Sequence, residues 1–367
     1  MGAITPILVL IALTLAIGPI AFPNVTWHII MIVDYISPGG WKLFDDPYVE
    51  KYHNYLMSRL PDVEEQPAVI LALEGATRES LREASHGYTV PVIIRGAVKG
   101  VPAIEKWTNR SWWIENYADE PVLCKMVDGL KEGDAPSCTI GDAFNSYAND
   151  DGGRLYISGE SKIFMRHPEL LGDVTNEYLE TLAPGKQVFT QLFLGYPGTG
   201  SDVHAAIGCN FFRMIAGRKK WWLMPQSQTA YVYASINPNG FSAHTKTKIG
   251  KGTDTPSPWL KKLERYTIEL EPGDLLLNTA WYWHGISNLG DPKSDDMVIG
   301  VPTRYAVENS IPAFKSNALL STIAFAAIRK SYGGMTQFTS NAENLQNGIE
   351  KARNARVGQM LDEVKTD

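Results

Sequence analysis

The sequence predicts a mainly β fold: a double-stranded β-helix barrel with flanking N- and C-terminal helices and an N-terminal membrane segment. The first observation is a density of short β-branched and aromatic runs separated by Gly and Pro, which is typical of an all-β barrel or sandwich. These runs are found at 187–195, 210–215, 219–224, 266–270, 274–279 and 297–303. The second is a pair of histidines, His204 and His284, each at the edge of a strand-like run. Strands that aim two imidazoles at one point suit a transition-metal ion.

The third observation concerns the N-terminus, where no charged residue occurs from Gly2 to Pro23. About 20 apolar residues span the hydrocarbon core of a bilayer, so residues 1–23 are long enough for a transmembrane anchor. The alternative is a cleaved signal segment, although the usual basic residues before the apolar run are missing. We favour the anchor, which predicts a membrane-anchored protein of the endomembrane or secretory pathway. In such a lumen, Asn24 and Asn109 would head glycosylation triplets.

Residues 24–87 are predicted to form a lead-in between this segment and the barrel. Its first part, 24–64, is rich in aromatic residues and predicts no regular element, so we expect a stalk or a cover over the core. Apolar residues at helix-like spacing predict one helix over 66–86.

The barrel domain is predicted over residues 88–311 and opens with a buried strand at Thr89–Val98. An insert at Ile236–Pro256, rich in Gly, Thr, Lys and Ser, predicts a loop near the barrel mouth. Residues 312–367 are predicted to be helical, because apolar residues recur there at helical spacing. The plain interpretation is a helix packed on the barrel, and the second is a dimerisation helix that would make the protein a homodimer.

Composition excludes some classes of function. The net charge of −6 provides no basic stripe for a phosphate backbone, so we expect no nucleic-acid partner. Cys124, Cys138 and Cys209 show no Cys-x-x-Cys spacing, and an odd number cannot all pair within the chain. Neither a zinc site nor a disulfide scaffold is therefore predicted.

The segments around the two histidines resemble the JmjC and cupin-like branch of the Fe(II)/2-oxoglutarate oxygenases, especially its asparaginyl-hydroxylase-like members. The resemblance covers roughly residues 88–305. The matching segments are Pro91–Gly96 with Trp107, Arg154–Val174, His204-Ala205-Ala206, Asn210-Phe211-Phe212, Gly217–Lys220 and Pro225-Gln226. The remaining histidines are expected to be core or surface residues, namely His28, His53, His86, His167 and His244.

The resemblance implies roles for particular residues. His204 and His284 would be ligands of Fe(II), and no catalytic residue beyond the metal site is implied. Lys219 would bind the distal carboxylate of 2-oxoglutarate, with Ser201 and Asn210 as further contacts to this co-substrate. The alternative for Lys219 is a surface lysine on a strand, since Lys220 is next to it and one of the two must point outward.

Ala206 departs from the family pattern, which has a metal-binding carboxylate two residues after the first histidine. A methyl group cannot bind iron. Asp202 lies two residues before His204 and is the nearest substitute ligand in sequence. Three functions follow: an oxygenase, most simply a hydroxylase, with an atypical site; a catalytically inactive binding protein; or a halogenase that uses the vacant position. The sequence does not tell a protein side chain from a small molecule as substrate.

Overall fold

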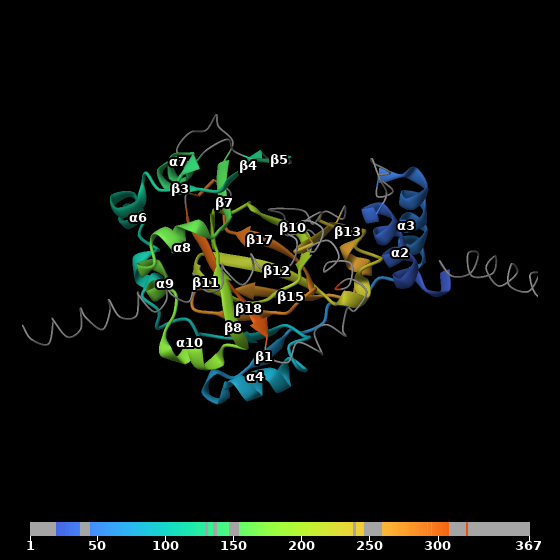
Figure 1. Ribbon diagram of the computed structural model, residues 1–367, viewed down its shortest axis with the longest axis horizontal. Helices are drawn as coiled ribbons and strands as arrows, with labels where there is room; N and C mark the ends of the chain where they lie inside the picture. The colour runs from blue at the N-terminus through green and yellow to red at the C-terminus, as the bar shows by residue number, and fades with distance from the viewer. Residues whose placement is uncertain are drawn as a thin grey trace, which may run out of the picture.

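The computed structural model describes residues 20–36, 45–128, 131–134, 138–146, 154–237, 240–245, 259–291, 293–294, 296–307 and 321. Two sheets dominate, a ten-stranded one and a six-stranded one, with a short two-stranded sheet beside them. Most helices lie around the larger sheet, whereas α2 and α3 stand together at the opposite end of the molecule (Figure 1).

Eight strands make up the barrel. The larger sheet contains the neighbours β16 (Leu275–Asn278), β11 (Cys209–Ala216), β18 (Val298–Val307) and β9 (Leu192–Gly195). The smaller sheet contains the neighbours β10 (Gly200–Ala206), β17 (Trp283–Leu289), β12 (Arg218–Met224) and β15 (Tyr266–Leu270). The chain passes from one sheet to the other at nearly every step, which is the winding of a double-stranded β-helix. The strand runs predicted in the second half of the chain are confirmed.

Shorter strands extend both sheets. The larger sheet adds β1 (Val69–Leu71), β2 (Val92–Ile94), β4 (Cys124–Asp128), β5 (Lys131–Asp134), β7 (Arg154–Glu160) and β8 (Gly185–Thr190). The smaller sheet adds β13 (Ala234–Ile236) and β14 (Ser242–Thr245), and β3 (Pro121–Val122) pairs with β6 (Cys138–Thr139). The described part of the predicted loop 236–256 is therefore partly a strand, because β14 pairs with β10.

The helices are α2 (Pro23–Ile36), α3 (Pro47–Arg59), α4 (Arg78–Ala84), α5 (Ala103–Lys106), α6 (Arg110–Tyr117), α7 (Ile140–Asn145), α8 (Lys162–Arg166), α9 (Glu169–Asp173) and α10 (Glu177–Leu182). Short 3-10 turns occur at η2 (Leu73–Gly75), η3 (Gln226–Gln228) and η4 (Leu260–Lys262). None of the helices within these described ranges is long and apolar enough to cross a membrane. The predicted anchor over 1–23 lies outside the described residues except for 20–23, as does the predicted helical region 312–367 except for Ser321.

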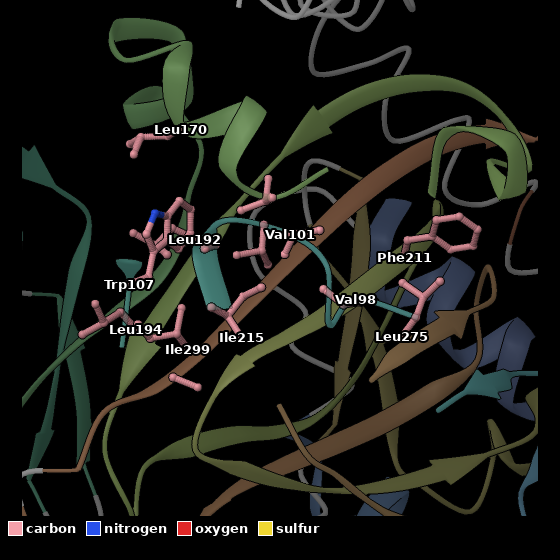
Figure 2. Packing of buried hydrophobic residues seen from close by; sticks show 14 of the residues in the cluster. Val98, Val101, Trp107, Leu170, Leu192, Leu194, Phe211, Ile215, Leu275 and Ile299 are labelled. Carbon is pink, nitrogen blue, oxygen red and sulfur yellow. The ribbon is translucent and has the colours of Figure 1, made fainter. Parts of the chain in front are cut away.

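Apolar side chains fill three regions. One lies between the larger sheet and its helices, where Trp107 and Leu170 pack against strand residues such as Leu192 and Ile299 (Figure 2). A second lies inside the barrel and contains Phe212 of β11 together with residues of the facing strands. The third lies on the outer side of the smaller sheet. Alternate residues of a strand point to opposite faces. Every second residue of a barrel strand can therefore pack outside the barrel, while the residues between them line the interior.

The described part of 24–64 is largely helical, as α2 and α3, so its prediction as irregular was wrong. Both helices pack on the outer side of the smaller sheet. Trp27 of α2 is fully buried and donates from Nε1 to the carbonyl of Ala234 at 2.8 Å. Trp27 and α3 residues pack with Val203 and Ala205 on the outer face of β10. Pro47 begins α3 and the Asp46 side chain caps it, local signals that the aromatic content obscured.

The helix predicted over 66–86 begins only at Arg78. Thr77 and Ser80 form a capping box there, which stops the helix from extending further toward the N-terminus. The β-branched residues before it form β1 instead, parallel to β2.

A disulfide joins Cys124 and Cys138, whose Cα atoms are 5.9 Å apart. This corrects the expectation from cysteine count. The pairing of β3 with β6 sets Val122 opposite Cys138 and so brings the two thiols together, which no sequence spacing revealed. Cys209 is free and buried.

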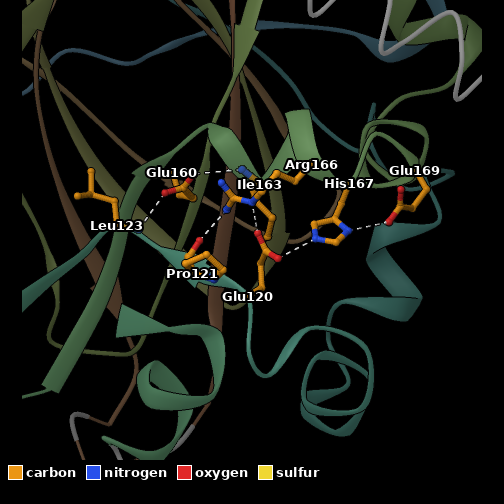
Figure 3. A network of polar contacts seen from close by, with 8 residues as sticks. All are labelled: Glu120, Pro121, Leu123, Glu160, Ile163, Arg166, His167 and Glu169. Atoms are coloured by element: carbon orange, nitrogen blue, oxygen red, sulfur yellow. Dashed lines mark hydrogen bonds and ion pairs between the residues drawn. The ribbon is translucent and has the colours of Figure 1, made fainter. Parts of the chain in front are cut away.

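A polar network attaches α8 to the strands beside this disulfide (Figure 3). The carboxylate of Glu120 bonds to Arg166 and, at 2.8 Å, to Nε2 of His167. Glu160 accepts from the backbone amides of Leu123 at 2.8 Å and Ile163 at 3.1 Å. The structural role expected for His167 is confirmed.

Candidate functional site

His204 and His284 converge inside the barrel. They are register partners on the neighbouring strands β10 and β17, and their ring centroids are 4.2 Å apart. The residues beside His204, Val203 and Ala205, point to the outer face, which leaves the imidazole on the interior side. Trp221 of β12 stacks on His284 with centroids 5.4 Å apart and helps to fix that ring.

Hydrogen bonds to backbone carbonyls define the tautomer of each ring. Nδ1 of His204 lies 2.8 Å from the carbonyl of Asp202, and Nδ1 of His284 lies 2.9 Å from the carbonyl of Tyr282. A carbonyl only accepts, so both Nδ1 atoms carry hydrogen and both Nε2 atoms keep a lone pair. This tautomer, with Nδ1 donating to a carbonyl, is common among histidines that bind metals.

Both imidazoles are neutral near neutral pH. Burial lowers the pKa of His204 to about 4 and the pKa of His284 well below 6.5. The charged or titratable groups that act on the rings, beyond the rings themselves, are His244, Arg304 and Lys125, and each lowers a histidine pKa further. All three of these groups are basic side chains.

Lys219 points inward, as predicted, while Nζ of Lys220 lies over the Trp222 ring at 5.6 Å. Only 1% of Lys219 is exposed, and its Nζ donates to Oδ1 of Asn288 at 2.6 Å. Nδ2 of Asn288 in turn donates to Oγ1 of Thr199 at 2.7 Å. Burial lowers the pKa of Lys219 to about 7, because a buried ammonium without an acidic partner is costly.

Gly300 makes room for this lysine. A Cβ atom at position 300 would meet the Phe212 ring at 2.1 Å and Cε of Lys219 at 3.0 Å. Any side chain there would displace Phe212 and crowd the lysine, so the glycine shapes this end of the interior.

The other predicted contacts are also on the interior side. Ser201 pairs with Ile286, a residue of the interior cluster, and a register shift separates it from His204. Asn210 of β11 is buried, and its Oδ1 has no hydrogen-bond partner. An unpartnered buried polar atom in a barrel interior is typical of a position that receives a ligand or water.

The predicted third ligand does not complete a set. Across the described ranges, no group of three or more His, Cys, Asp or Glu side chains is arranged to hold a metal ion. Asp202 thus orients His204 through its backbone carbonyl but does not form a three-residue cluster with His204 and His284. The imidazoles fit a metal, whereas the negative charge that usually accompanies them must come from a ligand.

Sequence reasoning missed five residues around the site. They are Thr199, His244, Asn278, Asn288 and Arg304. Asn288 had a signal, since it lies an even number of residues after His284 in the same strand-like run. His244 had none, because it stacks on His204 only through the pairing of β14 with β10.

A double-stranded β-helix with two inward imidazoles defines a cupin-like protein. The profile described as Cupin-like domain matches residues 79–305, more than half of the chain. The chain therefore belongs to the cupin-like, JmjC-type family.

Curated relatives are distant. HSPB1-associated protein 1 of Rattus norvegicus is 26% identical over 178 residues, which are 46% of this chain and 36% of the relative. Its Danio rerio homolog is 22% identical over 227 residues, 56% of this chain and 48% of the relative. tRNA wybutosine-synthesizing protein 5 of Gallus gallus is 25% identical over 250 residues, 60% of this chain and 74% of the relative. The chain thus spans less than half of the length of these HSPB1-associated relatives.

Proposed function

We propose that this protein is an Fe(II)/2-oxoglutarate-dependent oxygenase, a hydroxylase with an atypical metal site. The observation that carries the proposal is a neutral imidazole pair in the same interior as a buried lysine that has only neutral hydrogen-bond partners. Family membership supports it.

In this proposal, Nε2 of His204 and Nε2 of His284 would hold the iron. Lys219 would bind the distal carboxylate of 2-oxoglutarate, with Asn288 and Thr199 fixing the direction of its ammonium group. Ser201 and Asn210 would contact the rest of the co-substrate. When bound, iron and 2-oxoglutarate supply the oxidising chemistry that attacks a C–H bond. The chain's own part is to orient these groups and keep bulk water out.

The dicarboxylate matches the charge of the interior. An anion beside Lys219 stabilises its protonated form and so offsets the cost of burying an ammonium group. Because Ala206 brings no charge, the carboxylates of the co-substrate would also supply the negative charge near the imidazoles.

The test is an anaerobic titration of the full chain with Fe(II) and 2-oxoglutarate, followed by the metal-to-ligand absorption band. We expect a band in the wild type and in Lys220→Met, and none at the same concentrations in Lys219→Met. Lys220 is the matched control, since it lies on the same strand but points outward. A band that survives Lys219→Met would contradict the assignment.

The main alternative is a catalytically inactive binding protein. Ala206 and the lack of a three-residue ligand set in the described chain favour it. It predicts that 2-oxoglutarate or another anion binds without iron and that no absorption band forms. Halogenation is the second alternative, and it predicts a band that shifts when chloride is added.

Membrane anchoring is also proposed. Exposed apolar residues of the first described helical stretch continue the uncharged N-terminal run, namely Ile20, Phe22, Val25, Ile29 and Ile32. A disulfide is typical of secretory compartments and supports that location. Carbonate extraction separates an anchor from a cleaved signal, since an anchored protein stays with the membrane whereas a protein with a cleaved signal is released.

The name of the HSPB1-associated relatives refers to a protein partner, so a protein side chain is the first substrate class to test.

A further inference from the structure

Arg304 lies at the level of the imidazole pair. It is the register partner of Asn210 on β11, and Asn210 is the register partner of Asn278 on β16. Register partners on neighbouring strands share a face. Nδ2 of Asn278 lies 3.3 Å from the His284 ring, so this row faces the interior beside the histidines.

One nitrogen of the Arg304 guanidinium lacks a partner. Its Nη1 atom is buried without a hydrogen-bond partner, and Arg304 forms no ion pair with any residue that the structure describes. The buried Arg265 is a contrasting case. Its Nη1 donates to the backbone carbonyls of Val63, Leu260, Lys261 and Leu263.

Arg304 nevertheless keeps its charge. Burial lowers its pKa only to about 10, so the guanidinium is a cation at neutral pH. It lowers the pKa of both His204 and His284, as does His244. A cation that is partly removed from water is stabilised by a counter-charge, and Ala206 provides none where the family pattern has a carboxylate.

We propose that Arg304, in the row beside the imidazole pair, forms a binding site for one small anion, a carboxylate or a halide. The anion supplies the negative charge that residue 206 lacks. A planar guanidinium can bind a carboxylate through two parallel hydrogen bonds. The Asn210 amide is next in the row, and rotation about its last side-chain bond turns Nδ2 toward an anion. The site belongs to the interior assigned to the proposed oxygenase, but the proposal requires neither iron nor turnover.

The test uses the full chain in detergent, stripped of metal with a chelator. Formate, acetate, chloride and bromide are titrated at constant ionic strength, and binding is followed by calorimetry and by the shift in melting temperature. Arg304→Gln should weaken binding at least tenfold. Arg218→Gln is the matched control, because Arg218 is exposed on β12 and pairs with Glu269, and it should bind like the wild type.

Ala206→Asp provides a second variant, which keeps Arg304 and adds a carboxylate at the vacant position. It should abolish anion binding. Formate and acetate outcompeting halides identifies a carboxylate ligand, and the reverse identifies a halide. In crystals soaked with bromide, the anomalous peak should lie against Arg304.

Undiminished binding in Arg304→Gln would overturn the proposal, whatever Ala206→Asp does. Binding that is lost only in Lys219→Met would overturn it as well. Metal is absent from all of these titrations, so anion binding is measured independently of iron binding. A separate failure to bind iron would count against the proposed oxygenase but not against the anion site.

Discussion

The ammonium group of Lys219 lies inside the barrel, where burial lowers its pKa from 10.5 to about 7. At pH 8 most Lys219 side chains are therefore neutral in the empty protein. A bound dicarboxylate favours the charged form, so binding at pH 8 should take up close to one proton, and binding at pH 6 almost none. Calorimetry in buffers of different ionisation enthalpy measures this uptake without metal. Lys220→Met should retain the uptake, and its persistence in Lys219→Met would exclude Lys219 as its source.

The imidazole pair should make the protein sensitive to acid. The folded-state pKa of His204 is about 4 and that of His284 is well below 6.5. As pH falls below 6.5, the unfolded chain binds protons that the folded protein does not, and the free energy of unfolding decreases. Each pKa unit is worth about 1.4 kcal/mol, so the loss by pH 4.5 is on the order of a few kcal/mol.

Urea unfolding at several pH values checks this prediction. The double variant His204→Gln, His284→Gln should lose less stability than the wild type between pH 7 and pH 4.5. His86→Asn, at an exposed position, should follow the wild type. Parallel pH profiles for the wild type and the double variant would contradict the assignment of two neutral rings inside the barrel.

At the scale of elements, α2 holds the outer face of the smaller sheet through Trp27. The ring is fully buried, packs edge-on against Tyr233 at 5.0 Å between centroids and donates to Ala234. Trp27→Ala should cost about 3–5 kcal/mol, the range for removing a large core aromatic. Ile29→Ala, on the exposed side of the same helix, should cost far less. Denaturant unfolding measures both, and equal costs would mean that α2 does not pack as described.

The disulfide between β4 and β6 gives a second prediction for an element. Denatured, unreduced protein should react with one polymer-linked maleimide, at Cys209, and reduced protein with three. Cys124→Ser should raise the unreduced number to two. Closing a loop of this size stabilises a protein by about 3 kcal/mol in the chain-entropy account, so the variant should also unfold at lower denaturant. Three labels on unreduced wild type would disprove the bond.

At the scale of the whole molecule, the features that were predicted correctly are those that depend on local sequence patterns. Strand runs and the inward alternation of His284 are local patterns, and they predicted the barrel and the convergence of the imidazoles. Helix α2 was missed because burial of Trp27 depends on β13, far along the chain. The Cys124–Cys138 bond and the stacking of His244 on His204 depend on strand pairing in the same way.

Arg304 was missed for another physical reason. A single arginine in a strand normally indicates a surface position, since buried arginines are rare without partners. Only the register of β18 against β11 brings it beside Asn210 and the histidines. Ala206 is a different case, because the sequence alone showed that the metal-binding carboxylate is missing at this position. The structure adds which basic groups lie near the two histidines.

The most direct test of the account is an anaerobic crystal structure with Mn(II) in place of Fe(II) and with 2-oxoglutarate. We predict one metal ion at about 2.0–2.3 Å from Nε2 of His204 and Nε2 of His284, the range for nitrogen ligands of such ions. The distal carboxylate of 2-oxoglutarate should contact Nζ of Lys219. A metal ion bound elsewhere, or 2-oxoglutarate placed away from Lys219, would contradict the account.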